Sequence, residues 1–183
     1  MRDKNINFSF GRNWTKFVSR ALDEEKIEAA KKSLLKYLSP EEYRNKVFID
    51  IGCGSGIFSF GALSLGCKKV ISFDIDERSV EAARLVKDRF SGSAGGGRWE
   101  IFKGSILDDS LVRDLKGQGD IVYSWGVLHH TGDMRQAIRN AALLVKPGGF
   151  FIIAIYNKTA SSDFWKEFKK FYNSAPYFGA KDD

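Results

Sequence analysis

Short apolar runs and amphipathic stretches alternate through the middle of the chain, from about residue 46 to residue 157. The apolar runs are rich in β-branched and aromatic residues and predict five strands, at residues 47–51, 70–73, 99–102, 121–124 and 150–156. Runs that are apolar at nearly every position are typical of parallel strands buried on both faces. Alternation of such strands with helical segments predicts an α/β fold with a mostly parallel sheet.

Three helices are predicted between these strands, at residues 57–65, 77–90 and 134–145. Asp76 and Asp133 precede the second and third helices, and their carboxylates are expected to cap the first backbone N–H groups. A Pro-Gly-Gly sequence at residues 147–149 predicts a turn that leads into the fifth strand.

Two further amphipathic segments flank this core. Residues 23–38 place four apolar residues at helical spacing, Ile27, Ala30, Leu34 and Leu38, and predict a helix that packs against the sheet or covers it. Residues 163–172 repeat the pattern with aromatic side chains. We therefore expect a helical and aromatic cap at 1–45, a core at 46–157, and a C-terminal helix and tail at 158–183. Residues 91–97 are almost all Gly, Ser and Ala and predict a mobile loop.

Composition narrows the function classes. A chain of 183 residues with 43% apolar content is sufficient for one core. The net charge of +6 would assist nucleic-acid binding, but the basic residues are scattered in pairs, which favours solvated surfaces. Cys53 and Cys67 are too few for a disulfide framework or a metal cluster and are interpreted as small apolar fillers. No signal peptide or membrane-spanning run is evident, so a soluble, cytoplasmic protein is expected.

A glycine-rich sequence, DIGCGSG at residues 50–56, lies where the first strand ends and a helix begins. Glycines there allow a tight turn and close approach of a ligand to the backbone, while the helix N-terminus offers N–H groups. A dinucleotide site would place Gly or Ala where this chain has Ile57. Asp50 suits a ligand ammonium group, or a water bound to it, better than a pyrophosphate.

Asp74 ends the second strand, at the position where a carboxylate is expected to accept hydrogen bonds from ribose hydroxyls. The alternative is that Asp74, like Asp76, only begins the next helix.

These residues resemble motif I of the class I S-adenosylmethionine-dependent methyltransferases, and the resemblance continues through Gly104-Ser105-Ile106-Leu107, the fourth strand with its His-His end, and Lys146-Pro147-Gly148-Gly149. It implies a Rossmann-like, doubly wound sheet that binds S-adenosylmethionine and yields S-adenosylhomocysteine. The cofactor contacts that it implies are Asp50, Gly52, Cys53, Gly54 and Gly56 at the methionine part, Asp74 at the ribose, Ile75, Ser105 and Ile106 at the adenine, and Ser124 and Trp125 of strand four near the amino group. Ser105 departs from the Asp that many relatives carry.

His129 and His130 follow the fourth strand, at the sheet edge where ligands bind in α/β folds. Methyl transfer is an in-line displacement that mainly requires alignment, and a base is needed only for an acceptor such as a phenol or alcohol. We expect one histidine, His129 rather than His130, to be that base, because neighbours in an extended segment point to opposite sides. The alternative is that an imidazole only holds the loop ending in Thr131 and Gly132.

The methyl acceptor is not identified by the sequence. Signatures of DNA-amino, arginine and metal-dependent catechol methyltransferases are missing, which leaves a small molecule as the expected acceptor. The aromatic segment 8–17 is expected to roof the site, with Asn13, Trp14, Tyr156 and Asn157 lining it. The alternatives are a binding module that has lost catalysis, an NAD-linked oxidoreductase, opposed by Asp50 and Ile57, and an RNA methyltransferase, suggested by charge.

The resembled fold continues after strand five with a helix and two more strands, for which this chain has no strand-like run. We therefore expect a natural truncation or a fragment, with weak or no turnover. Strand five would then be an apolar sheet edge, which favours homodimer formation through that edge or its cover by the C-terminal helix.

Overall fold

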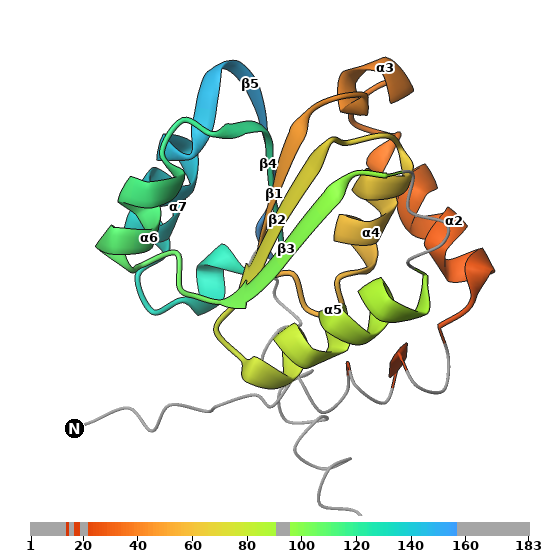
Figure 1. Ribbon diagram of the computed structural model, residues 1–183. Helices are drawn as coiled ribbons and strands as arrows, with labels where there is room; N and C mark the ends of the chain where they lie inside the picture. Colours follow the sequence, from red (N-terminus) through yellow and green to blue (C-terminus); the bar gives the residue numbers. More distant parts are fainter. Residues whose placement is uncertain (1–13, 15–16, 19–21, 91–95, 157–183) are drawn as a thin grey trace, which may run out of the picture.

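The computed structural model describes residues 14, 17–18, 22–90 and 96–156, and its centre is a five-stranded parallel sheet (Figure 1). The strands lie in the order β3-β2-β1-β4-β5. Their bounds are Val47–Ile51 for β1, Lys69–Asp74 for β2, Arg98–Lys103 for β3, Gly119–Trp125 for β4 and Val145–Ala154 for β5. The strand order reverses at β1, because β2 and β3 follow on one side of it and β4 and β5 on the other. In sheets of this kind, ligands bind at the reversal, beyond the carboxyl ends of the strands. The predicted Rossmann-like, doubly wound fold is confirmed.

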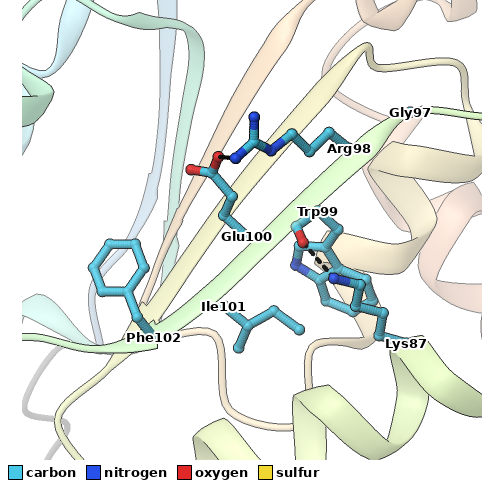
Figure 2. A pocket seen from close by; sticks show the side chains of 7 residues that line it. All are labelled: Lys87, Gly97, Arg98, Trp99, Glu100, Ile101 and Phe102. Atoms are coloured by element: carbon cyan, nitrogen blue, oxygen red, sulfur yellow. Dashed lines mark hydrogen bonds and ion pairs between the residues drawn. The ribbon is translucent and has the colours of Figure 1, made fainter.

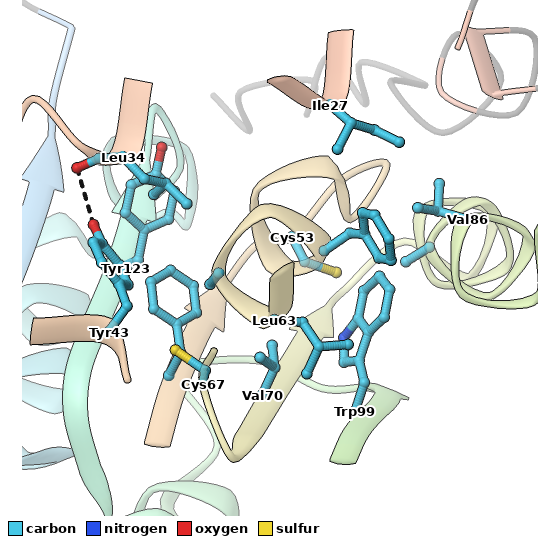
Figure 3. Close-up of a cluster of buried hydrophobic side chains, with 14 of the residues drawn as sticks. Ile27, Leu34, Tyr43, Cys53, Leu63, Cys67, Val70, Val86, Trp99 and Tyr123 are labelled. Carbon is cyan, nitrogen blue, oxygen red and sulfur yellow. Dashed lines mark hydrogen bonds between the residues drawn. The ribbon is translucent and has the colours of Figure 1, made fainter. Parts of the chain in front are cut away.

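Helices cover both faces of the sheet (Figure 1). One face carries α2 (Glu24–Leu34), α4 (Ile57–Ser64) and α5 (Glu77–Arg89), and the other carries α6 (Asp109–Leu115) and α7 (Met134–Leu143). Each face has its own apolar cluster. Figure 3 shows the first of these, in which Cys53 and Cys67 are buried as free thiols, as predicted for apolar fillers.

The predicted helix caps are present. The carboxylate of Asp76 accepts a hydrogen bond from the backbone N–H of Arg78, and that of Asp133 accepts one from Gln136. The four apolar residues predicted to share one helix face are all buried, at Ile27, Ala30, Leu34 and Leu38. The helix itself ends at Leu34, and a short helix α3 (Pro40–Tyr43) follows. At the start of α3, the Glu42 carboxylate accepts a hydrogen bond from the Ser39 N–H at 2.7 Å.

Three local predictions differ from the structure. Helix α6, capped by Asp108, was not predicted. The predicted turn at residues 147–149 is instead a bulge inside β5, because Val145 already pairs with Gly119 and regular pairing resumes only at Phe150. The two histidines lie in a 3-10 turn, η2 (Leu128–His130), and not in an extended segment.

Strand β5 has one neighbour, β4, among the described strands, and Phe150 on it is 40% exposed. The predicted helix at 163–172, the loop at 91–95, and Asn13 and Asn157 lie outside the described residues. No helix in the described part of the chain is both long and apolar enough to cross a membrane. The domain boundaries at residues 45 and 157 stay predictions.

Candidate cofactor-binding site

The glycine loop joins the end of β1 to α4 in a backbone conformation that requires glycine. The N–H groups of Gly52 and Cys53 both donate to the carbonyl oxygen of Phe73, at 2.8 and 3.2 Å, so the loop is fixed to the end of β2. Gly52 has φ +72°, and a Cβ there would lie 2.5 Å from the side chain of Val127. Gly56 has φ +75°, and a Cβ there would lie 2.8 Å from that of Ala83 on α5. Both positions therefore exclude larger residues.

Gly54 lies at the middle of the loop, with φ +55°. Its N–H donates to Oδ2 of Asp74 at 3.0 Å. The indole of Trp14 covers it, since a Cβ on Gly54 would lie 3.0 Å from the indole nitrogen. No side chain caps the N-terminus of α4, whose N–H groups follow directly after the loop. The N–H groups of Gly52, Cys53, Gly54 and Gly56 thus have partners within the protein, and the open backbone donors lie at the start of α4.

Asp74 stands at the end of β2 with its carboxylate divided between two backbone donors. Oδ2 accepts from Gly54, and Oδ1 accepts from the N–H of Asp76 at 3.0 Å. Burial raises the pKa of this carboxyl, and the two backbone hydrogen bonds oppose the rise. Each oxygen has a second lone pair for a ribose hydroxyl. Next to it, the Ile75 side chain is 70% exposed and offers an apolar surface at the predicted adenine position.

Asp50 lies beneath the loop and is only 2% exposed. Its Oδ2 accepts a short hydrogen bond from the Ser59 hydroxyl on α4. Burial raises the pKa of the carboxyl to about 7, against the lowering effect of Ser59, and the charge of Asp74 raises it further. The predicted contact between Asp50 and a ligand ammonium group stays a prediction.

The predicted adenine residues after β3 differ in exposure. Ser105 is half-buried, and its Oγ accepts from the N–H of Leu107 at 3.2 Å. Ile106 is 3% exposed and belongs to the apolar cluster beneath α6 and α7, while its carbonyl oxygen accepts from the Asn140 side chain at 2.8 Å. Ile75 therefore has far more open surface for a ring than Ile106.

The end of β4 adjoins the glycine loop. Ser124 is buried, and its hydroxyl donates to the carbonyl of Ile51 at 3.2 Å. Trp125 is 37% exposed and stacks on Tyr123, with ring centroids 6.0 Å apart. Tyr37 lies against the same indole, at 5.6 Å between centroids. Ser124 is thus a structural contact between strands, and Trp125 carries the open surface.

His129 and His130 lie side by side on η2, with ring centroids 3.9 Å apart. The prediction that they point to opposite sides is wrong, because a 3-10 turn replaces the extended segment on which it depended. Both ring nitrogens of His129 are buried and have no hydrogen-bond partner among the described residues. Burial lowers the pKa of His129, and His130 lowers it further. The hydroxyl of Thr131 holds this loop by donating to the carbonyl of Leu128 at 2.8 Å. The structure therefore does not favour the alternative in which the His129 imidazole only holds the loop.

A surface hollow lies elsewhere in the described part of the molecule, along the open edge of β3 (Figure 2). It has a volume of about 590 Å³ and is lined by Lys87 and residues 97–102. Lys87 donates to the Trp99 carbonyl at 2.7 Å, and Arg98 pairs with Glu100 at 2.9 Å. These interactions occupy polar groups of an edge strand, and the hollow contains none of the predicted site residues. Position at the carboxyl ends of the strands, and not volume, identifies the candidate site.

Comparison with known proteins agrees with this geometry. A family model described as a methyltransferase domain matches residues 23–177. A ubiquinone biosynthesis O-methyltransferase from Bordetella avium is 32% identical over 114 residues, which cover 62% of this chain and 44% of that protein. A ribosomal protein L11 methyltransferase from Photobacterium profundum is 33% identical over 120 residues, covering 66% and 37%. The chain thus spans less than half the length of these curated relatives.

Solved structures share the fold. The magnesium protoporphyrin IX methyltransferase from Synechocystis PCC 6803, solved with bound SAH, has a TM-score of 0.58 at 19% identity, over 99% of this chain and 74% of that chain. The YcgJ protein from Bacillus subtilis has a TM-score of 0.59 at 21% identity, over 80% and 58%. The family model covers most of the chain, and the fold and motif geometry agree with it. The chain therefore belongs to the methyltransferase domain family.

Proposed function

We propose that this chain binds S-adenosylmethionine across the carboxyl ends of β1, β2 and β3 and transfers its methyl group to a small-molecule acceptor beyond β4. The observation that carries the proposal is the Asp74 carboxylate at the end of β2, hydrogen-bonded to the Gly54 N–H at 3.0 Å. This bond holds a ribose acceptor beside the glycine loop, at the sheet edge where ligands bind in such folds. We expect the reaction to take place in the cytoplasm.

The residues present fit the cofactor. The bound cofactor supplies a methyl group on a positively charged sulfur, which is already a good leaving group. Asp74 would accept hydrogen bonds from the ribose hydroxyls, and Ile75, Ser105 and Ile106 would hold the adenine. The N–H groups at the start of α4, which no side chain caps, would bind the carboxylate of the methionine part. The protein's main contribution is alignment, which is worth an effective molarity of about 10⁵–10⁸ M in well-oriented reactions.

Exposed aromatic side chains near the end of β4 support an apolar or planar acceptor. Trp125 is 37% exposed, Tyr37 47% and Tyr156 63%, and the ring of Tyr156 packs edge-on against His129 at 5.0 Å. Aromatic walls with few polar groups are typical of small-molecule sites. The Bordetella relative, named for ubiquinone biosynthesis, is consistent with such an acceptor. The L11 relatives are named for a ribosomal protein and favour a protein acceptor as the second candidate.

His129 is the general base that we propose for an acceptor with a hydroxyl group. Its lowered pKa keeps the imidazole neutral at pH 7, and its nitrogens have no partner within the described residues, so one can accept a proton. The neighbouring His130 lowers the pKa of His129 further and so disfavours its charged form.

A thermal-shift panel tests the proposal. S-adenosylmethionine and S-adenosylhomocysteine should each raise the melting temperature in a concentration-dependent way, and NAD should not, because only ligands that bind the native state stabilise it. A shift with NAD alone would overturn the proposal in favour of an oxidoreductase. Methyl transfer is then tested with radiolabelled cofactor against phenols, against L11 and against RNA. Binding without turnover on any of them would favour a module without catalysis.

A further inference from the structure

Four buried side chains form a hydrogen-bonded chain beneath the glycine loop. The Trp99 indole N–H donates to Ser72 Oγ at 2.8 Å, and Ser72 Oγ donates to Ser59 Oγ at 2.8 Å. Ser59 Oγ in turn donates to Oδ2 of Asp50. β3, β2, α4 and β1 contribute one residue each, and none is more than 3% exposed. The chain therefore links four of the elements that surround the cofactor loop.

The direction of this chain follows from its two ends. An indole N–H can only donate a hydrogen bond, and an ionised carboxylate can only accept one. When Asp50 is ionised, Ser59 must use its proton toward Asp50, and Ser72 then uses its own proton toward Ser59. Every proton in the chain therefore points toward Oδ2 of the ionised Asp50. Trp99 itself is locked in place, since it packs against Phe60 and lies 3.0 Å from the Cβ position of Gly56.

Asp50 accepts a hydrogen bond from Ser59, but it forms no ion pair and has no counter-charge in the described part of the chain. Three titratable groups interact electrostatically with Asp50, namely Cys53, Asp74 and Tyr123. Burial raises the pKa of both Cys53 and Tyr123, so these two stay neutral near pH 7. Asp74 adds negative charge. The anion at Asp50 thus depends on the hydroxyl chain and lacks a cation.

We infer that the Trp99–Ser72–Ser59–Asp50 chain is a positioning relay that presents Asp50 to the positively charged methionine part of the cofactor, so that cofactor binding expels a proton from Asp50. This inference rests on the proposed function, because it takes the ammonium and sulfonium groups as the missing counter-charge. Ser59, Ser72 and Trp99 act through Asp50 and do not touch the ligand. The consequence is that affinity depends on pH in the range where cells operate.

The size of the effect follows from the pKa of Asp50, about 7. About half of the free protein then carries this proton at pH 7, and binding should release up to about half a proton. If the ligand binds only the ionised form, the affinity should be about tenfold lower at pH 6 than at pH 8, because the competent fraction falls by that factor.

Isothermal titration of S-adenosylhomocysteine, from pH 5.5 to 8.5 and in buffers of different ionisation enthalpy, measures both quantities. We expect wild-type protein to release protons and to bind more tightly as pH rises. Asp50→Asn should lose the proton release and flatten the profile. Ser59→Ala should move the midpoint upward by about one pH unit, since it removes a hydrogen bond to the charged form, and Trp99→Phe should move it in the same direction by less.

Ser64→Ala is the matched control. Ser64 lies on the same helix, and its hydroxyl donates to the Phe60 carbonyl outside the relay. A purely structural role of the relay would lower affinity equally at every pH without moving the midpoint, and that result would overturn the inference. Unchanged midpoints in both Ser59→Ala and Trp99→Phe would do the same. Failure of wild-type protein to bind at any pH would instead refute the proposed function.

Discussion

Substitution of Asp74 tests whether this residue binds the ribose or only shapes the loop. The structure gives its carboxylate two backbone donors, Gly54 and Asp76, and leaves one lone pair on each oxygen for the ribose. A hydrogen bond to a charged group contributes about 1.5–3 kcal/mol, so loss of both ribose bonds amounts to about 3–6 kcal/mol before water replaces them. Asp74→Asn keeps one acceptor oxygen and should weaken S-adenosylhomocysteine by roughly ten- to a hundredfold. Asp74→Ala should weaken it further.

Isothermal titration of the three proteins measures these affinities. Asp76→Ala is the control, because that carboxylate caps α5 and should affect stability, by about 1 kcal/mol, more than affinity. Equal affinities for wild-type protein and Asp74→Ala would refute the reasoning and leave Asp74 as a residue that only starts a helix.

The remaining four predictions concern other positions in the fold. Gly54→Val should abolish cofactor binding in a chain that still folds by circular dichroism, because a β-branched residue at φ +55° would press on Trp14; normal affinity would show that the loop is only a turn. Transfer to a phenol should rise with pH below 6.5 and level off by pH 7, since His129 must be neutral and its pKa is lowered; His129→Asn should lose that rise. Asp50→Asn should gain stability relative to wild type in thermal melts as pH rises from 5 to 7 and gain no more above pH 7. With a folded-state pKa raised to about 7, folded wild type keeps a proton that the unfolded chain loses at about pH 4, and the stability from this proton is lost as pH rises to the folded-state pKa; parallel melting curves would contradict this. Lysines at Phe151 and Ile153 of the β5 edge should reduce self-association measured by light scattering, and a monomeric wild type with unprotected β5 amides in hydrogen exchange would refute that edge as an interface or covered surface.

Sequence patterns predicted the sheet well because each predicted strand is a short run that is apolar at most positions and has no competing helical period. The centre of β4, for example, is buried at Ile121, Val122 and Tyr123, and all three positions are apolar or aromatic. The caps were equally readable, since Asp76 and Asp133 each stand at the junction of a polar turn and an amphipathic segment. The start of β5 could not be read from the sequence, because Pro147 and the two glycines after it are typical of a turn. Only the pairing of Val145 with Gly119 keeps the bulged segment in the sheet.

The candidate site was predicted in its backbone but not in its interior. Glycines at residues 52, 54 and 56 have a sequence signature because their positive φ angles exclude other residues. Ser59 and Ser72 have none, since a serine on a helix or strand is ordinary until its neighbours in space are known. Helix α6 has only seven residues, too few to show a period. The two histidines were misplaced because nothing local distinguishes a 3-10 turn from an extended end of a strand.

The position of the cofactor site can be mapped by titrating isotopically labelled protein with S-adenosylhomocysteine and following the amide resonances that move. We expect the largest shifts on residues 52–57, on Asp74 and Ile75, and on Ser105 and Ile106, at the carboxyl ends of three neighbouring strands. Shifts confined to Lys87 and residues 97–102, which line the hollow along β3, would contradict this expectation, as would a spectrum that saturating ligand leaves unchanged.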